Sequence, residues 1–268
     1  MQTAGKVLVV TGAGNGVGRA VTLEALRRGA KVAAVDVSQA GLDETVRLAG
    51  APGDLAGYQL DITDKAAVQA LPAQVAERFG AVDGVIHIAA IIQPFLKVWE
   101  LDDALIERVL AINLWGTLNI DRAFLPVLLA RPEAHLVNTS SMGGFLPVPG
   151  QTIYGTAKAG VKLLTEGLHA ECRGTSVGVT VVIPGGMSTN IAGNSGVSLD
   201  IDPERAAKAA KNLTTPESAA RQILDGMERR AYRVVIGRDA KMMDLLYRVN
   251  PSGAAAFIAR QMKGLIGG

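Results

Sequence analysis

Seven short runs of apolar residues recur along the chain, and each is bounded by glycine, proline or polar turn residues. The runs are rich in valine and isoleucine, which is typical of strands that are buried on both faces of a sheet. The sequence therefore predicts strands at residues 6–11, 30–36, 56–61, 82–90, 134–140, 176–184 and 232–237.

The segments between these runs carry apolar residues at helical spacing. Val17, Val21 and Ala25, for example, follow one another at intervals of four residues, as on one face of a helix. Similar spacing recurs near residues 101–130 and 151–173. Because strands and helices alternate, we expect an α/β fold with a doubly wound, parallel, seven-stranded sheet and helices on both of its faces.

The length of 268 residues suits one large domain, residues 1–268,. The regular pattern lapses at about residues 188–215, and a long interruption of this kind is often a lid over a binding site, so we expect a substrate loop there. The tail, at about residues 239–268, carries two short apolar-patterned helices. These helices could cover the sheet edge, line a substrate pocket or join subunits.

The composition excludes several classes of protein. With 49% hydrophobic and 19% charged residues and no run of 18 uninterrupted apolar residues, the chain is neither membrane-spanning nor disordered,. A net charge of +2 without a broad basic face argues against nucleic-acid binding,. Cys172 is the single cysteine, and the first strand begins by Lys6, which leaves no room for a signal peptide. We therefore expect a cytoplasmic protein.

The first predicted strand runs into T-G-A-G-N-G-V-G, residues 11–18. Glycines in such a turn let the backbone approach a pyrophosphate, whose charge the N-terminus of the next helix stabilises. A strand-to-helix turn can also contain glycines without a ligand, so this pattern alone is weak. The next strand ends at Asp36, about 20 residues farther on, where a carboxylate can bind the adenosine ribose. The alternative for Asp36 is a cap of the following helix.

The same carboxylate would repel a 2′-phosphate, so the sequence favours NAD over NADP. Neither Asn15 nor Val37, the two positions beside these motifs, offers a cation to receive that phosphate. Arg19 is the nearby counter-argument, but its place in the sequence predicts that it lies on the first turn of the helix.

Tyr154 and Lys158 are four residues apart in a predicted helix, so their side chains leave the same face,. A phenolate that serves as a base near neutral pH must be stabilised by roughly 3 to 4 kcal/mol. A nearby ammonium and an oxidised nicotinamide could supply the positive charge. An interfacial tyrosine beside a surface lysine is the common alternative, but here the pair follows a strand that ends in two serines.

Together these motifs resemble those of the classical short-chain dehydrogenase/reductase family, over residues from about 6 to 190. The shared features are TGAGNGVG, Asp36, Asp61-Ile62, Asn113, Ser141, Tyr154 with Lys158, and P-G-G-M-S-T at 184–189. The resemblance implies a Rossmann-type fold and hydride transfer between an alcohol and its carbonyl compound.

The resemblance also implies the roles of individual residues. Tyr154 would exchange the substrate proton, Ser141 would polarise the substrate oxygen, Lys158 would hold the nicotinamide ribose, and Asn113 would anchor a water in the proton path. Ser140 would be structural. The residues expected to contact the cofactor are Gly12, Asn15, Gly16, Val17, Gly18, Asp36, Asp61, Ile62, Ile88, Tyr154, Lys158, Pro184, Met187 and Thr189.

Asn113 has some independent support, because an asparagine within an apolar helix needs a hydrogen-bond partner. A helix bend or a buried polar contact is the alternative. The chain departs from the family where N-N-A-G usually follows the fourth strand, since His87-Ile88-Ala89-Ala90 stands there. The asparagine-mediated support of that loop is therefore in doubt, and Ala90 restricts the backbone.

His87 is alone in a buried strand, so we expect a core histidine with its hydrogen bonds satisfied. The three histidines and the cysteine form no metal-binding pattern, and no metal is expected,.

Apolar residues dominate the positions expected to face the nicotinamide. They are Ile91, Ile92, Pro94, Phe95, Met142, Phe145, Leu146, Val148, Met187 and Ile191. Few charges lie among them, so we expect a hydrophobic substrate. The alternative is that several of these residues pack the loop itself.

The sequence thus predicts an NAD-dependent oxidoreductase that interconverts a hydrophobic secondary alcohol and its ketone or aldehyde. An NADP-preferring carbonyl reductase and a non-catalytic, cofactor-binding regulatory protein on the same fold are the alternatives. The resemblance further implies a homo-oligomer, a dimer or tetramer formed through the two long helices near 101–130 and 151–173. Neither a nucleic acid nor a membrane is an expected partner.

Overall fold

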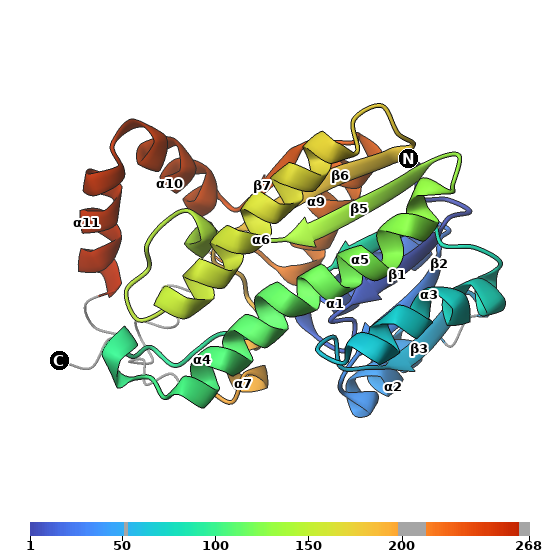
Figure 1. Cartoon of the computed structure of the whole chain (residues 1–268), viewed down its shortest axis with the longest axis horizontal. Coiled ribbons are helices and arrows are strands. Elements are labelled where there is room, and N and C mark those ends of the chain that lie inside the picture. The colour runs from blue at the N-terminus through green and yellow to red at the C-terminus, as the bar shows by residue number, and fades with distance from the viewer. Residues whose placement is uncertain (51–52, 198–212, 263–268) are drawn as a thin grey trace.

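The computed structural model describes residues 1–50, 53–197 and 213–262. At its centre is a parallel sheet of seven strands in the order β3-β2-β1-β4-β5-β6-β7 (Figure 1). The strands are β1 (Val7–Thr11), β2 (Lys31–Asp36), β3 (Leu55–Gln59), β4 (Gly84–His87), β5 (Ala134–Thr139), β6 (Val177–Pro184) and β7 (Arg233–Ile236). This strand order confirms the predicted doubly wound, Rossmann-type sheet.

Helices cover both faces of the sheet, as predicted. The α-helices are α1 (Gly16–Arg27), α2 (Gln39–Leu48), α3 (Lys65–Phe79), α4 (Asp103–Leu110), α5 (Gly116–Leu129), α6 (Thr152–Glu171), α7 (Ile191–Asn194), α9 (Pro216–Glu228), α10 (Arg238–Val249) and α11 (Pro251–Met262). Shorter helical turns are η1 (Val98–Glu100), the π-helical η2 (Ala111–Trp115) and η3 (Met142–Gly144).

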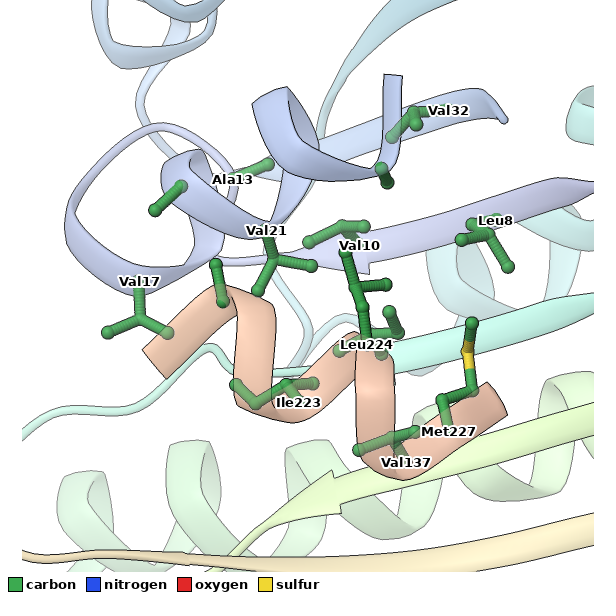
Figure 2. Close-up of a cluster of buried hydrophobic side chains, with 14 of the residues drawn as sticks. Leu8, Val10, Ala13, Val17, Val21, Val32, Val137, Ile223, Leu224 and Met227 are labelled. Atoms are coloured by element: carbon green, nitrogen blue, oxygen red, sulfur yellow. The ribbon is translucent and has the colours of Figure 1, made fainter. Parts of the chain in front are cut away.

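Two hydrophobic layers hold the sheet between the helices. On one face, side chains such as Val10 of β1 pack against Val21 of α1 and Leu224 of α9 (Figure 2). On the opposite face, Val9 packs in a cluster that includes Phe124 of α5. Successive residues of a strand point to opposite faces, so both faces of the strands are apolar, which explains the near-continuous apolar runs in the sequence.

The fourth strand is shorter than the predicted run at residues 82–90, because β4 ends at His87. Beyond that point the backbone N–H groups of Ile88 and Ala89 donate to Thr11 Oγ1 at 3.0 and 3.2 Å instead of continuing the sheet. The chain therefore leaves the sheet beside the end of β1, where the glycine loop begins.

The predicted C-terminal tail forms α10 and α11, which stand to one side of the sheet (Figure 1). Met243, Ala254 and Ile258 of these helices form a buried cluster with Leu146. The tail thus packs on the segment that follows Ser141, and the three uses that the sequence left open for it stay open. Residues 263–268, and residues 198–212 of the predicted lid, lie outside the described part of the chain. In that part, no helix is both long enough and apolar enough to cross a membrane.

Candidate active site

The glycine loop connects β1 to α1 at the carboxyl edge of the sheet. Gly12 and Gly16 adopt φ angles of 70° and 49°, in the left-handed region that favours glycine,. A Cβ atom at Gly18 would collide with the carbonyl oxygen of Gly12. The loop therefore needs glycine at each of these three positions, and it keeps the backbone open for a close approach by a ligand.

Other predicted cofactor residues surround the start of α1. Asn15 caps this helix, since its Oδ1 accepts from Gly16 N at 2.7 Å, and its Nδ2 donates to Asn194 of α7 at 3.2 Å. Thr189 lies against Gly16, with its Cγ2 3.4 Å from the position of a Cβ there. Asn15, Gly16 and Thr189 also line a groove of about 580 Å³ beside α1. Val17 differs from them, because its side chain is buried in the core.

Asp36 ends β2 and lies against the glycine loop. Its two carboxylate oxygens accept from Gly14 N at 2.8 Å and from Ser38 N at 2.9 Å. The Asp36 carboxylate thus anchors the glycine loop. Ser38, and not Asp36, caps α2, because Ser38 Oγ accepts from Gly41 N.

Arg19 lies on the first turn of α1, as predicted, and its guanidinium is engaged there. Its Nε donates to Thr45 Oγ1 at 3.0 Å, and its Nη2 donates to the carbonyls of Gly14 and Gly41. Thr45 Oγ1 in turn donates to Ala13 O at 2.8 Å. Two carbonyls of the glycine loop, those of Ala13 and Gly14, are thus bound by side chains of α2 and α1.

Asp61 and Ile62 follow β3 at the same edge of the sheet. The Asp61 carboxylate accepts from both the N–H and the hydroxyl of Thr63, each at 2.8 Å. Ile62 is buried and packs close to Gly116, where a Cβ would lie 2.7 Å from Ile62 Cδ1. Asp61 is exposed, so its carboxylate is accessible to a ligand.

Tyr154, Lys158 and Ser141 come together at the carboxyl end of β5. Tyr154 and Lys158 lie on α6, and Lys158 Nζ is 5.9 Å from the centroid of the Tyr154 ring. Lys158 Nζ donates to Thr139 O at 2.9 Å. Ser141, two residues after Thr139, hydrogen-bonds the Tyr154 phenol.

Small residues allow α6 to approach the turn that follows Ser141. A Cβ at Gly155 would lie 2.9 Å from Gly143 O, and a Cβ at Gly144 would lie 2.8 Å from Lys158 O. Ser140 strengthens the contact, because its Oγ donates to Lys158 O at 2.7 Å. Ser140 thus has a structural position, and the close packing holds Ser141 next to Tyr154.

Burial shifts the pKa values of this group toward uncharged forms. It raises the pKa of the Tyr154 phenol above its ordinary value, and the hydrogen bond from Ser141 only partly opposes that shift. Burial also lowers the pKa of Lys158 to about 8. The phenol is therefore neutral near pH 7, and positive charge close to the ring would favour its phenolate,.

Asn113 lies in the π-helical turn η2, which interrupts the long helix expected at residues 101–130. Its side chain is buried and has the partners that the sequence analysis required. Asn113 Oδ1 accepts from Ile91 N at 3.2 Å, while Nδ2 donates to Ile91 O and Val109 O, each at 2.9 Å. The asparagine therefore combines a helix irregularity with a buried polar contact. Single π-turns of this kind are frequent at functional sites.

The expectation for His87 was wrong in one respect. The ring is buried and its Nδ1 pairs with Thr11 Oγ1 at 2.8 Å. Thr11 already accepts from two backbone N–H groups, so its hydroxyl donates to Nδ1, and Nε2 carries the ring proton,. Nε2 has no partner among the described residues. Burial, and then the charge of Lys158, lowers the His87 pKa to about 3, so the ring is neutral.

Several residues expected to line the substrate pocket also pack against the tail. Leu146 is fully buried there, and the Phe145 ring lies 5.9 Å from that of Tyr247. Met142 and Val148 are half-buried beside the same cluster, and Met187 packs instead on the core between α1 and α9. Leu146 therefore packs the loop itself, which was the alternative to lining the substrate pocket. The half-buried residues keep part of their surface exposed.

The remaining predicted cofactor contacts lie at the ends of the central strands. Pro184 is the last residue of β6, and Ile88 directly follows β4. The loop after Pro184 is held by Asp239 of α10, whose Oδ2 accepts from Gly186 N at 2.7 Å. Asp239, like Thr45, carries no motif that sequence analysis could recognise, since each acts on a backbone group far away in the sequence. No group of residues suited to holding a metal occurs in the described ranges.

Comparison with known proteins identifies the family to which the chain is similar. The model of the family described as short chain dehydrogenase matches residues 6–200. SadH of Mycobacterium tuberculosis, provisionally named as an oxidoreductase, is 38% identical over 262 residues, which cover 95% of this chain and 94% of that protein. 2-(S)-hydroxypropyl-CoM dehydrogenase 3 of Xanthobacter autotrophicus is 31% identical over 225 residues, covering 82% of this chain and 88% of that enzyme.

The fold has a solved counterpart as well. A short chain dehydrogenase/reductase from Burkholderia phymatum, in complex with NAD, superposes with a TM-score of 0.82 at 27% identity, covering 94% of this chain and 95% of that chain. The motifs, the fold and the matched family agree, and the chain belongs to the short-chain dehydrogenase/reductase family of oxidoreductases.

Proposed function

We propose that the protein is an NAD-dependent oxidoreductase that interconverts a hydrophobic secondary alcohol and its ketone or aldehyde. The observation that carries this proposal is the grouping of the half-buried Tyr154 and Ser141 with the buried Lys158, on the same edge of the sheet as the glycine loop. A phenol hydrogen-bonded to a serine and close to an ammonium can accept or donate a proton at a substrate oxygen. Tyr154 is therefore the proposed general acid/base.

Ser141 is the proposed group that polarises the substrate oxygen. Its Oγ accepts from Gly143 N at 3.1 Å, so the hydroxyl proton remains available for donation. The same hydroxyl is hydrogen-bonded to the Tyr154 phenol. A substrate oxygen that takes this place would receive hydrogen bonds from both hydroxyls, which stabilises the negative charge that develops on it.

Lys158 supplies positive charge beside the phenol. One of its three N–H groups is used by Thr139 O, which leaves two for the ribose hydroxyls and the phenol. With a pKa of about 8 the side chain is mainly cationic at pH 7. Its charge favours the phenolate of Tyr154 electrostatically, which makes the tyrosine easier to ionise.

The residues of the first loop fit a dinucleotide. Gly12 and Gly18 let the turn pack closely against Ala89 and against itself, and the start of α1 offers N–H groups to a pyrophosphate. Bound NAD would supply the hydride acceptor, and NADH the donor. Asp36 would accept hydrogen bonds from the adenosine ribose.

NAD is favoured over NADP because the Asp36 carboxylate would repel a 2′-phosphate. The nearby cation Arg19 is occupied by the carbonyls of Gly14 and Gly41, so it is not free to receive that phosphate. These contacts support the preference that the sequence suggested.

The half-buried apolar side chains of Met142, Val148, Ile91 and Ile92 near the catalytic group support a hydrophobic substrate,. The relative from Xanthobacter autotrophicus is named for a hydroxypropyl group, which contains a secondary alcohol. That name supports the proposed reacting group, while the rest of the substrate is inferred from the apolar lining.

We also propose a cytoplasmic homo-oligomer, a dimer or a tetramer. Trp115 and Leu163, on the long helical elements expected to join subunits, are 59% and 71% exposed, and contact with a second copy would bury them. Cys172 is a free, buried thiol, which is compatible with a reducing compartment.

The test begins with fluorescence titrations of NADH and NADPH, followed by a panel of hydrophobic alcohols and ketones with the cofactor that binds more tightly. Replacing Tyr154 by Phe should lower kcat at least about 100-fold, with the NADH Kd within about twofold of the wild-type value. The matched control is Tyr232→Phe, at a half-exposed tyrosine.

Full turnover by the Tyr154→Phe variant would refute the proposed acid/base. Tighter binding of NADPH would favour the carbonyl reductase, and NADH binding without turnover of any panel member would favour the regulatory protein.

A further inference from the structure

Gln93 is a polar side chain with 0% exposure in the loop that follows β4. Its Oε1 accepts from two backbone N–H groups, those of Ile153 at 2.9 Å and Tyr154 at 3.0 Å. Its Nε2 donates to Gly150 O at 3.0 Å. Both ends of the amide are therefore bound to the segment in which α6 begins.

These bonds make Gln93 the N-terminal cap of α6. The first N–H groups of a helix lack partners within it, and a side chain of the N-cap residue usually accepts from them. The N-cap residue here is Gln151, which makes no such bond. Its Nε2 donates instead to Gln93 O at 2.6 Å. The cap thus comes from a residue about 60 positions earlier in the chain.

The loop that carries Gln93 is tied to two further elements of the site. Ile91 exchanges hydrogen bonds with the side chain of Asn113 through both its N–H and its carbonyl group. The N–H of Ile92 donates to Ser195 Oγ, just after α7, at 3.0 Å. Three consecutive residues therefore connect the loop after β4 to η2, α7 and α6.

We propose that Gln93 is a positioning residue for proton transfer, which fixes the first turn of α6 and with it the phenol of Tyr154 opposite Ser141. The inference rests on the proposed function, because Tyr154 is the residue that would exchange the proton. One of the two capped N–H groups belongs to Tyr154 itself. Loss of the cap would release the turn that carries the phenol, and a displacement of about 1 Å at a reacting group can lower the rate about 100-fold.

The main test replaces Gln93 by Met, which keeps the length of the side chain and removes the acceptor. We expect kcat to fall about 10- to 100-fold, while KM and the NADH Kd stay within about twofold of wild type. In Gln93→Glu, a neutral carboxyl group offers the same acceptor and an O–H donor. This conservative variant should keep at least about a third of the wild-type kcat at pH 6, where burial favours the neutral form.

A spectroscopic arm reports on Tyr154 without any substrate. The chain has four tyrosines, so labelling their ring Cζ atoms with ¹³C gives four NMR signals, and Tyr154→Phe identifies the one from Tyr154. In Gln93→Met this signal should move by more than its linewidth, with and without NADH. In Gln93→Glu at pH 6 it should stay near its wild-type position.

The control is another helix cap. Asp102 caps α4 through Leu105 N at 2.7 Å, and it lies outside the catalytic group, so Asp102→Ala should lose stability but keep kcat and the Tyr154 signal. If Gln93→Met does not fold, Gln151→Met releases Gln93 O and should cause a smaller change in the same direction.

Either an unmoved Tyr154 signal or a kcat within twofold of wild type in the variant that folds would overturn the positioning role. A wild-type protein without turnover would count against the proposed function alone, since the NMR arm still decides the role of Gln93.

Discussion

Thr11 offers a sharp test of how the chain leaves the sheet at the active site. Its hydroxyl is buried, accepts from the N–H groups of Ile88 and Ala89, and donates to Nδ1 of His87. Valine has almost the same shape as threonine but cannot form any of these bonds. The variant Thr11→Val would therefore leave two N–H groups and one ring nitrogen without partners.

The magnitude follows from the burial of these partners. An unpaired buried polar group costs about 1–3 kcal/mol, and the two N–H groups belong to half-buried residues that water can partly reach. The added methyl group recovers about 0.8 kcal/mol. We therefore expect Thr11→Val to lower the free energy of unfolding by about 2–4 kcal/mol.

Thr22 of α1 is the matched control. It is as fully buried as Thr11, but its Oγ1 has no hydrogen-bond partner among the described residues. Thr22→Val should therefore be neutral or stabilising by up to about 1 kcal/mol. Urea unfolding followed by circular dichroism gives both values, provided that the slopes agree. A loss below 1 kcal/mol in Thr11→Val, or an equal loss in the two variants, would refute the reasoning.

Three further predictions concern charge and close packing. Burial raises the pKa of Asp121 from 3.8 to about 7, so the folded state binds more protons than the unfolded state between these pH values. The free energy of unfolding should therefore fall as pH rises from 4 to 7, by up to about 4 kcal/mol. Urea unfolding at pH 5 and pH 8 should show this loss in wild type and not in Asp121→Asn. Gly155→Ala places a Cβ 2.9 Å from Gly143 O and should lower kcat, whereas Gly167→Ala, which meets nothing within 4 Å in the same helix, should stabilise by about 0.5–1 kcal/mol,; equal effects would contradict the packing argument. Asp36→Asn should improve NADPH binding relative to NADH by about 1–3 kcal/mol, or roughly 5- to 150-fold, and an unchanged ratio of the two Kd values would show that this carboxylate does not select the cofactor.

The sequence alone determined the features that depend on local pattern. Valine-rich apolar runs predict buried strands. A turn that needs a positive φ angle, as at Gly12, favours glycine. Tyr154 and Lys158 share a helical face because they are four residues apart. The fold class, and the residues that gather around the glycine loop and the tyrosine, followed from signals of this kind.

Tertiary structure decided the features that depend on contacts between distant segments. The end of β4 at His87 is set by a hydroxyl on β1, and the same contacts leave His87 Nε2 without the partner that its buried position suggested. No periodicity records such a contact, because the two groups meet only after the sheet has formed.

Gln93 is a second residue whose contacts the sequence pattern did not predict. In the sequence it is one polar residue in an apolar loop, and its nearest motif is a departure from the family pattern. In the folded chain its amide caps the helix of the proposed catalytic tyrosine. The tail likewise has three possible uses in the sequence, and its packing against Leu146 is a contact that the sequence did not predict. Local sequence thus determined which elements form and which candidate site residues they carry. Tertiary contacts decided where strands end and what holds those residues in place, because hydrogen bonds and packing act through space rather than along the chain.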